Sequence, residues 1–194
     1  YMFYGCTKLT SINLSSFDTF SVTNMEYMFY GCTKLTSINL SSFDIFSVTN
    51  MEYMFYGCSS LTEIDAEWIT SSVLNIDSMF YNCFSLKYLD LSIFDTSLVT
   101  NMKELFYNCL ELTSINLKNF KTNEVTDMQS MFYGCKSLKS LNVSSFVTLN
   151  VNNMKSMFYN CIKLTSLDLS NFNTQNVTNM ESMFSRCKNL IYIN

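Results

Sequence analysis

The residues best suited to chemistry in this chain of 194 residues are its eight cysteines. They recur every 26 residues, apart from one interval of 25. An even number of cysteines is compatible with a framework of disulfides. A zinc site is not expected, because the chain has no histidine and no Cys-x-x-Cys pair. The eight are Cys6, Cys32, Cys58, Cys83, Cys109, Cys135, Cys161 and Cys187.

Amide and carboxylate side chains form a second series, with one member in each repeat. On a regular surface these groups could coordinate a cation or hydrogen-bond a glycan, and we treat them as a candidate binding face. The alternative is an amide ladder, in which they bond to one another along a sheet. The series is Asn13, Asn39, Asp65, Asp90, Asn116, Asn142, Asp168 and Asn194.

Asp65 and Asp90 are neighbours in this series and mark the best place to look for Ca²⁺. Full coordination of Ca²⁺ takes about six to eight oxygen ligands. Two carboxylates fall short of that number, so we predict neither a bound metal nor a cofactor.

Tyrosines form a third series, which ends where Ser185 takes the place of tyrosine. One interpretation is an exposed aromatic stripe that binds a partner protein or a glycan. The other is structural, with each ring filling the gap between neighbouring repeats. The series is Tyr4, Tyr30, Tyr56, Tyr81, Tyr107, Tyr133 and Tyr159.

A fixed period of this length indicates a stacked repeat array. Residues 1–26 and 27–52 differ only in that Thr19 becomes Ile45. The third repeat is one residue shorter before its aromatic residue, which predicts a local kink with Trp68 in the phenylalanine position. We expect residues 1–194 to form a single solenoid of about seven and a half repeats. Since neither end carries a polar capping repeat, we expect it to be part of a longer array.

Two hydrophobic patterns alternate within each repeat. Leu9, Ile12 and Leu14 end in strict alternation, which predicts a short strand. Identical strands one repeat apart are expected to pair in parallel and in register.

The second pattern places Met25, Met28, Phe29 and Cys32 at the spacing of one helix face. Thr23 and Glu26 form a capping box at the start of this helix, as do Thr49/Glu52, Thr126/Gln129 and Thr178/Glu181 in other repeats. Glycine or asparagine in the left-handed conformation is expected to end the helix. These residues are Gly5, Gly31, Gly57, Asn82, Asn108, Gly134 and Asn160, and only Arg186 departs from the series.

Strands pair about 4.8 Å apart, whereas packed helices need about 8–10 Å. The array is therefore expected to curve, as an α/β leucine-rich-repeat solenoid with a parallel sheet on the concave face and short helices on the convex face. The Cα atoms of neighbouring cysteines on the helix side would then lie farther apart than the roughly 7 Å that a disulfide allows. This spacing favours a column of free, buried thiols over the disulfide framework.

The segments Phe17-Asp18-Thr19, Val22-Thr23-Asn24-Met25 and Met28-Phe29-Tyr30-Gly31-Cys32 recur along the whole chain. They resemble the BspA-like leucine-rich repeats of bacterial and protist surface proteins. The resemblance implies a cell-surface or secreted protein that adheres to host or matrix molecules or builds surface layers, and it transfers no catalytic residues.

One position departs from ordinary leucine-rich repeats. Where those repeats carry a buried asparagine ladder, this chain carries phenylalanine, so a phenylalanine spine is predicted. Its members are Phe17, Phe43, Phe94, Phe120, Phe146 and Phe172.

Composition narrows the function further. The net charge is −4 and the basic residues look scattered along the chain, which argues against nucleic acid. No apolar run approaches the roughly 20 residues of a membrane span in this segment. An enzyme is not expected, because catalysis needs different residues converging at one place. We predict an extracellular or cell-surface protein that binds a protein or glycan ligand. The alternative is a structural component of a fibre or surface layer, built from further copies of itself.

Overall fold

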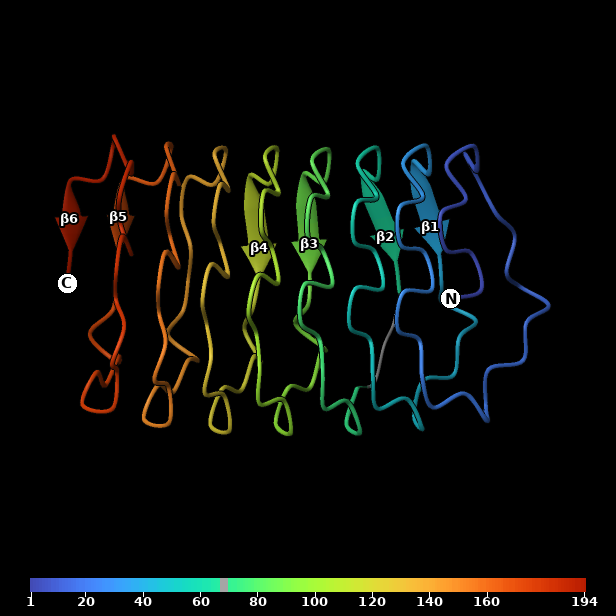
Figure 1. The fold of residues 1–194 in the computed structure, drawn as a ribbon, viewed down its shortest axis with the longest axis horizontal. Coiled ribbons are helices and arrows are strands. Elements are labelled where there is room, and N and C mark those ends of the chain that lie inside the picture. The colour runs from blue at the N-terminus through green and yellow to red at the C-terminus, as the bar shows by residue number, and fades with distance from the viewer. Residues whose placement is uncertain (67–69) are drawn as a thin grey trace.

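A computed structural model describes residues 1–66 and 70–194 of the chain. Each repeat forms one coil, and the coils stack side by side along the long axis of the molecule (Figure 1). We number the coils 1 to 8 in chain order, starting at residues 1, 27, 53, 78, 104, 130, 156 and 182. The expectation for Trp68 lies outside the described residues.

Short strands form one side of the array, which we call the sheet side. They pair in parallel and in register, with Ile38 opposite Ile64 and Leu89 opposite Ile115. Within a strand the middle residue is the more buried, as the alternating pattern predicts. The strands are β1 (Ser37–Asn39), β2 (Glu63–Asp65), β3 (Tyr88–Asp90), β4 (Ser114–Asn116), β5 (Ser166–Leu167) and β6 (Tyr192–Ile193).

The sheet is not continuous, which corrects one expectation. It consists of three two-stranded pieces, β1–β2, β3–β4 and β5–β6. Coils 1 and 6 contribute no strand at residues 9–14 and 138–143, although both carry the same alternating pattern. The hydrophobic pattern thus predicts where a strand can form, but pairing depends on the neighbouring coil as well.

The predicted helices are wrong: the described residues contain strands and turns but no helix. In the segment that starts at Met25, alternate N–H groups donate to the next coil, as Met25 does to Asn50 at 2.8 Å and Phe29 to Met54 at 2.9 Å. The intervening N–H groups close turns within the coil, as from Met28 to Met25. The apolar residues still face the core, because this chain of turns buries the same positions that a helix would.

This turn side also carries a ladder between coils. Parallel bridges link Asn24, Asn50, Asn75, Asn101, Asp127, Asn153 and Asn179 in succession. Both sides of the array are therefore held at the strand spacing of about 4.8 Å. The predicted curvature required the coils to be spaced more widely on the helix side than on the sheet side. Because both sides have the same spacing, this cause of curvature is absent. Among the described residues there is no helix that is long and apolar enough to cross a membrane.

Left-handed backbone recurs at two places in the turn segments of coils 2 to 8. The predicted glycine and asparagine series adopts it, with φ between 55° and 70°, and Arg186 adopts it as well at 64°. The second place was not foreseen, because it carries residues that rarely have positive φ. They are Tyr27, Tyr53, Ser78, Glu104, Ser130, Ser156 and Ser182.

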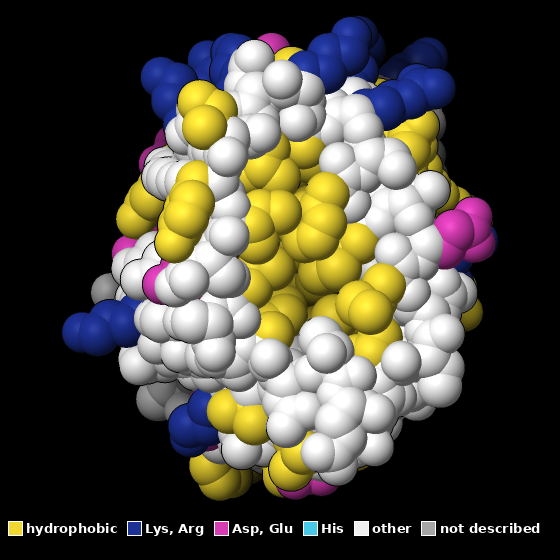
Figure 2. Space-filling view, turned by 90° about the vertical axis from the view of Figure 1, so that its left-hand side faces the viewer, with side chains coloured by type: hydrophobic (Ala, Val, Ile, Leu, Met, Phe, Trp, Pro, Cys, Tyr) yellow, Lys and Arg dark blue, Asp and Glu magenta, His cyan; other side chains and the backbone are white. Residues whose placement is uncertain are grey.

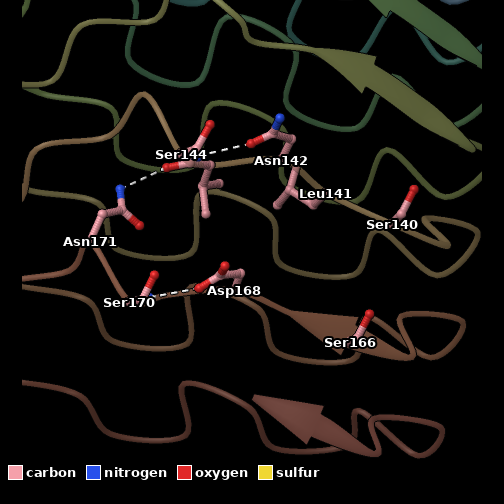
Figure 3. Close-up of a pocket in the computed structure, with 9 residues that line it drawn as sticks. Ser140, Leu141, Asn142, Ser144, Ser166, Asp168, Ser170 and Asn171 are labelled. Carbon is pink, nitrogen blue, oxygen red and sulfur yellow. Dashed lines mark hydrogen bonds between the residues drawn. The ribbon is translucent and has the colours of Figure 1, made fainter. Parts of the chain in front are cut away.

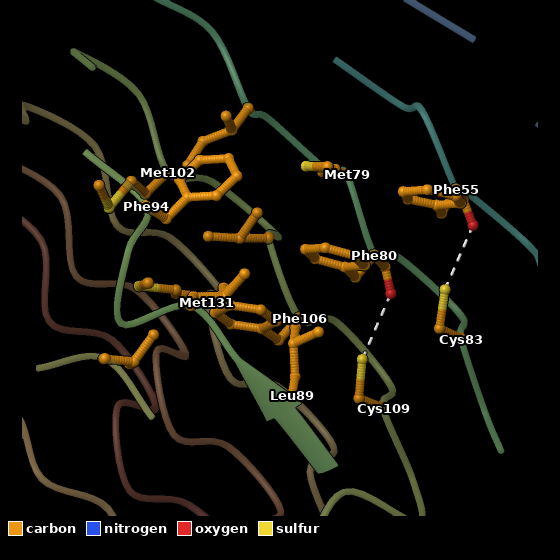
Figure 4. Packing of buried hydrophobic residues seen from close by; sticks show 14 of the residues in the cluster. Phe55, Met79, Phe80, Cys83, Leu89, Phe94, Met102, Phe106, Cys109 and Met131 are labelled. Atoms are coloured by element: carbon orange, nitrogen blue, oxygen red, sulfur yellow. Dashed lines mark hydrogen bonds between the residues drawn. The ribbon is translucent and has the colours of Figure 1, made fainter. Parts of the chain in front are cut away.

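Two phenylalanine stacks fill the core. The predicted spine is confirmed from Phe94 to Phe172, with Phe94, Phe120 and Phe146 buried and successive ring centroids 6.2 to 6.4 Å apart. A second stack runs along the turn side, where Phe55 and Phe80 lie 5.7 Å apart with nearly parallel rings (Figure 4). The same view shows Met79, Met102 and Met131 among these rings and Phe94 of the spine.

A buried threonine ladder replaces part of the missing asparagine ladder. The Thr122 hydroxyl donates to the carbonyl of Val147 at 2.8 Å and accepts from the N–H of the same residue at 2.8 Å. Thr19, Thr70, Thr96 and Thr148 donate in the same way to the following coil. At this position coil 2 carries Ile45, which leaves that step without a side-chain bond.

The cysteine column is buried in coils 2 to 7. Each of these thiols donates to a carbonyl of the preceding coil, as Cys83 does to Phe55 at 3.2 Å and Cys109 to Phe80 at 3.3 Å (Figure 4). Burial raises the pKa of Cys32 to about 11 and that of Cys135 to about 12. The argument from helix spacing was wrong, since coils at strand spacing bring cysteines within disulfide reach. The thiols instead find a carbonyl partner.

Figure 2 views the array from the end at which β6 lies, where a broad area of apolar side chains is visible. Inside the array the equivalent side chains are covered by the next coil. Each coil therefore buries its apolar residues against its neighbours.

We predict that Thr122→Val lowers the free energy of unfolding by about 1–3 kcal/mol, because it leaves a buried N–H and a carbonyl without partners. Thr100→Val, at an exposed threonine, is the matched control and should change stability by less than about 0.5 kcal/mol. Denaturant titration of both variants checks this. Equal stability of the two variants would contradict a stabilising role of the threonine ladder.

Thiol labelling tests the cysteine column. Cys6 is exposed, and hydrogen bonding with Cys161 lowers the pKa of half-buried Cys187 to about 7. At pH 8 these two should react rapidly with a disulfide reagent such as DTNB, and the other six only after unfolding. The Cys6→Ser/Cys187→Ser variant should lose the rapid phase completely. Rapid reaction of further thiols in the native chain would contradict the burial of the column.

Candidate functional site

The predicted amide and carboxylate series lies on the sheet side and points to solvent. All seven residues from Asn13 to Asp168 are exposed except Asn116, which is half-buried. In the six of these residues other than Asp65, the side-chain oxygen accepts from the N–H two residues further on, as Asn39 does from Ser41 at 2.9 Å and Asp168 from Ser170 at 3.0 Å. These local bonds fix the orientation of the side chains.

The amide ladder between coils is present in part. Asn39 donates to Asp65 at 2.7 Å, and Asn194 donates to Asp168 at 3.3 Å. Most side chains of the series form their hydrogen bonds within their own coil and through the side-chain oxygen. Most of the asparagine amides therefore keep an N–H available to a ligand. Hydrogen bonds from Ser92 lower the pKa of Asp90, and the N–H of Ser170 lowers that of Asp168.

Asp65 and Asp90, the candidate Ca²⁺ ligands, belong to separate two-stranded sheets. Asp90 accepts from the Tyr88 hydroxyl at 3.1 Å. Across residues 1–66 and 70–194, no three cysteine, aspartate or glutamate side chains gather closely enough to hold a metal ion.

The tyrosine series forms a continuous stack on the turn side. Centroids of successive rings from Tyr4 to Tyr159 lie 4.4 to 4.8 Å apart, and the rings are within 7° of parallel. The guanidinium of Arg186 lies 5.5 Å from the centroid of the Tyr159 ring. The rings from Tyr30 to Tyr133 have a stacked neighbour on both faces, so only their edges and hydroxyls are available to a ligand. For these rings the geometry favours the structural interpretation.

Acidic side chains lie beside this stack. The pKa values of Glu52, Asp77 and Glu104 are raised, mainly because these carboxyl groups are at least partly buried. Asp77 has partners in the Ser78 hydroxyl at 2.8 Å and the Asn101 amide at 3.1 Å. These carboxylates are thus bonded within the turn segments.

Two features of the sheet side were missed from the sequence. The first is a hollow of about 300 Å³ between coils 6 and 7, at the place where coil 6 forms no strand. Polar side chains line most of it, as Figure 3 shows. A second hollow of about 250 Å³ lies between coils 1 and 2, again beside a coil without a strand.

The second feature is a ridge of basic side chains. The scattered distribution inferred from the sequence is wrong in space, because eight of the twelve lysine and arginine residues lie within the corner that follows the left-handed glycine or asparagine and precedes the strand. All eight are exposed. They are Lys8, Lys34, Lys87, Lys136, Lys139, Lys163, Arg186 and Lys188. Aligning the repeats by position, and not reading along the chain, is the signal that could have revealed this ridge.

Similar solved structures are leucine-rich repeat proteins by description, as the resemblance to BspA-like repeats predicted. A leucine-rich cell surface protein from Faecalibacterium prausnitzii is 17% identical over 87% of this chain and 75% of its own, with a TM-score of 0.38. A leucine-rich repeat protein from Treponema pallidum is 20% identical over 77% and 75%, with a TM-score of 0.39.

A third, from Bacteroides ovatus, is 19% identical over 89% of this chain and 58% of its own, with a TM-score of 0.30. No curated protein matches the chain. One family model, described as "Mycoplasma protein of unknown function, DUF285", matches residues 1–89 and 79–192. Because these two matches span nearly the whole array, the chain belongs to this family of Mycoplasma proteins, DUF285.

Proposed function

We propose that this chain is a non-enzymatic binding module of the cell surface or the extracellular space, which contacts a protein or carbohydrate through its sheet side. The observation that carries the proposal is the exposed amide and carboxylate series. Its side chains repeat at the coil spacing and are held in one orientation by local hydrogen bonds such as that from Ser41 to Asn39. A rigid, regular polar surface suits an extended ligand with repeating polar groups.

Two further observations support a binding role over catalysis. In the described coils most columns repeat one residue type or closely similar types, which favours a regular surface over the convergence of different catalytic groups at one place. The six buried cysteines are unsuited to nucleophilic chemistry, because they donate to carbonyls such as that of Phe80 and burial raises the pKa of thiols such as Cys135. The location at the cell surface is the part of the proposal that comes from the resemblance to BspA-like repeats.

Self-association is a second candidate, because four consecutive coils expose large apolar side chains along one corner. Phe20 and Phe46 occupy the same position of coils 1 and 2 and are 69% and 65% exposed. In coils 3 and 4 that position carries Ser71 and Ser97, and the exposed apolar residues are Leu74 and Leu98, three and one residues further along the chain and 50% and 47% exposed. We call Phe20, Phe46, Leu74 and Leu98 the apolar row. Exposed apolar surface of this kind is typical of contacts between proteins.

The sheet-side proposal is tested by adhesion of cells that display the chain to a panel of immobilised extracellular-matrix proteins and polysaccharides. Ser37→Glu/Ser114→Glu places charges on the sheet side, in a column where Glu63 occurs naturally. We expect it to weaken binding to the recognised surface at least about tenfold, since new charges must be desolvated or repelled at the contact.

The control for this test is Ser21→Glu/Ser47→Glu, in a column away from the sheet side where Glu124 occurs naturally. It should leave adhesion unchanged. Failure of the native chain to bind any member of the panel, or equal effects of the two double variants, would contradict a binding role of the sheet side.

The apolar row is tested by light scattering at increasing protein concentration. Phe20→Ser/Phe46→Ser, which introduces the residue found at Ser71 and Ser97, should abolish association of the native chain. Ile93→Ser removes an exposed apolar residue outside the row and should have no effect. A native chain that stays monomeric throughout, or an Ile93→Ser variant that behaves like the double variant, would count against self-association through this row.

A further inference from the structure

The backbone of coil 6 departs from that of its neighbours on the sheet side. In most coils this segment bonds to the adjacent coil, as the N–H of Thr62 does to the carbonyl of Thr36 at 2.8 Å. Within the described chain, the N–H and carbonyl groups of residues 140–142 have no protein partner. Unpaired backbone groups have a strong tendency to find a hydrogen-bonding partner. This segment can therefore offer both donors and acceptors to a bound molecule.

The hollow of about 300 Å³ lies at this segment and is the larger of the two on the sheet side. Figure 3 shows hydroxyl and amide groups arranged around it, with the Asp168 carboxylate near its lower end. Asn171 closes one side through its hydrogen bond to the carbonyl of Val143 at 3.0 Å. The hydroxyl, amide and carboxylate groups match the hydroxyl-rich surface of a sugar. These polar lining residues are Ser140, Asn142, Ser144, Ser166, Asp168, Ser170 and Asn171.

The basic ridge is densest beside this hollow. Lys136, Lys139, Lys163, Arg186 and Lys188 lie in the corners of coils 6, 7 and 8. The corners are adjacent, because the N–H of Lys163 donates to the carbonyl of Lys136 at 3.2 Å. No acidic residue occurs in these three corner segments, 134–139, 160–165 and 186–191.

The five bases are also available to a ligand. Figure 2 shows lysine and arginine side chains gathered along the upper edge of this end of the array. The ion pairs found among the described residues use Lys103, Lys121 and Lys155, and none of the five. A chain with a net charge of −4 thus presents an unneutralised basic strip, in which Lys139 directly precedes Ser140 of the hollow.

We propose that the hollow between coils 6 and 7, together with the five bases of coils 6 to 8, binds an anionic polysaccharide. Sugar hydroxyls bond to the serine and asparagine side chains and to the free backbone groups of coil 6. Carboxylate or sulfate groups of the same polysaccharide pair with the lysine and arginine side chains, which recur at about the 4.8 Å spacing of the coils. This inference rests on the proposed binding role of the sheet side and names its ligand class.

Other polyanions fit the geometry less well. Single-stranded nucleic acids are held by stacking of their bases on open aromatic faces, and no aromatic side chain lines this hollow. An anionic membrane would contact the bases through charge alone and would leave the hollow unused. An acidic peptide carries few hydroxyl groups for the serine and asparagine side chains.

Binding of purified native chain to oligogalacturonate and to dextran sulfate, measured by calorimetry, tests the proposal. Neutral dextran, polyglutamate, single-stranded DNA and phosphatidylserine vesicles serve as comparison probes. We expect at least one of the two anionic polysaccharides to bind, and to bind at least about tenfold more tightly than any comparison probe, because charge and hydroxyl contacts act together.

Two variants locate the site. Lys136→Glu/Lys163→Glu should weaken polysaccharide binding at least about tenfold, since each reversal replaces an attraction by a repulsion. Ser166→Tyr should also weaken it by filling the hollow, and the fold tolerates tyrosine in this column at Tyr88 and Tyr192. The matched controls are Lys8→Glu/Lys34→Glu and Ser37→Tyr, which should change binding by less than about twofold. Thermal melting of each variant establishes that it is folded.

The outcomes are distinct. Absence of binding to both anionic polysaccharides overturns the inference, as does equally tight binding of DNA, polyglutamate or vesicles. Binding that is indifferent to Ser166→Tyr, or equally sensitive to the control variants, also overturns it and leaves only general attraction between charges. Adhesion that is lost in Ser37→Glu/Ser114→Glu but unaffected by Lys136→Glu/Lys163→Glu would sustain the sheet-side function while excluding this ligand site.

Discussion

Backbone hydrogen bonds between neighbouring coils, on both sides of the array, are the constraint on which the rest of this structure depends. On the sheet side they pair short strands such as β1 and β2, and on the turn side they join alternate residues such as Phe29 and Met54. The turn-side ladder runs through all eight coils, and together with the paired strands it holds the coils at about the strand spacing. Equivalent residues therefore stack directly on one another, which is why one repeat produces columns of phenylalanine, tyrosine, cysteine and threonine.

The columns in turn decide which residues are structural and which are free to bind. Tyrosine rings cover each other's faces, and thiols and threonine hydroxyls are bonded to carbonyls of adjacent coils. By contrast, the amide and carboxylate series of the sheet side bonds mainly within its own coil, as Asn142 does, and basic side chains of the corners such as Lys163 are exposed. These are the surfaces to which we assign the proposed recognition. Where coil 6 leaves its backbone unpaired, the hollow interrupts the regular surface.

The repeat period, the strand positions, their parallel register and the Phe94–Phe120 spine could be predicted from the sequence, because each depends on the spacing of apolar residues alone. The turn segments could not. Met25, Met28, Phe29 and Cys32 fit one face of a helix, but a chain of turns with alternate bonds to the next coil buries the same four residues. The left-handed conformation of residues such as Tyr27 and Glu104 could not be predicted, since neither residue type favours it.

The candidate site was only partly predictable for a related reason. Asn142 and Asp168 were identified, because their column is visible once the repeats are aligned. The hollow beside them was not, since Leu138, Leu141 and Val143 carry the same strand pattern as coils that do pair. The basic ridge was recoverable in principle. Lys136 and Arg186 lie far apart along the chain, but both fall in the corner between turn and strand.

The central claim is that the turn side bonds between coils and not within a helix. Nuclear magnetic resonance couplings across hydrogen bonds test it directly, because they identify the acceptor carbonyl of a given amide. The account predicts a coupling between the amide of Phe106 and the carbonyl of Met131, which lie 2.9 Å apart. A coupling from the Phe106 amide to the carbonyl of Met102, the partner four residues earlier that a helix requires, would contradict it.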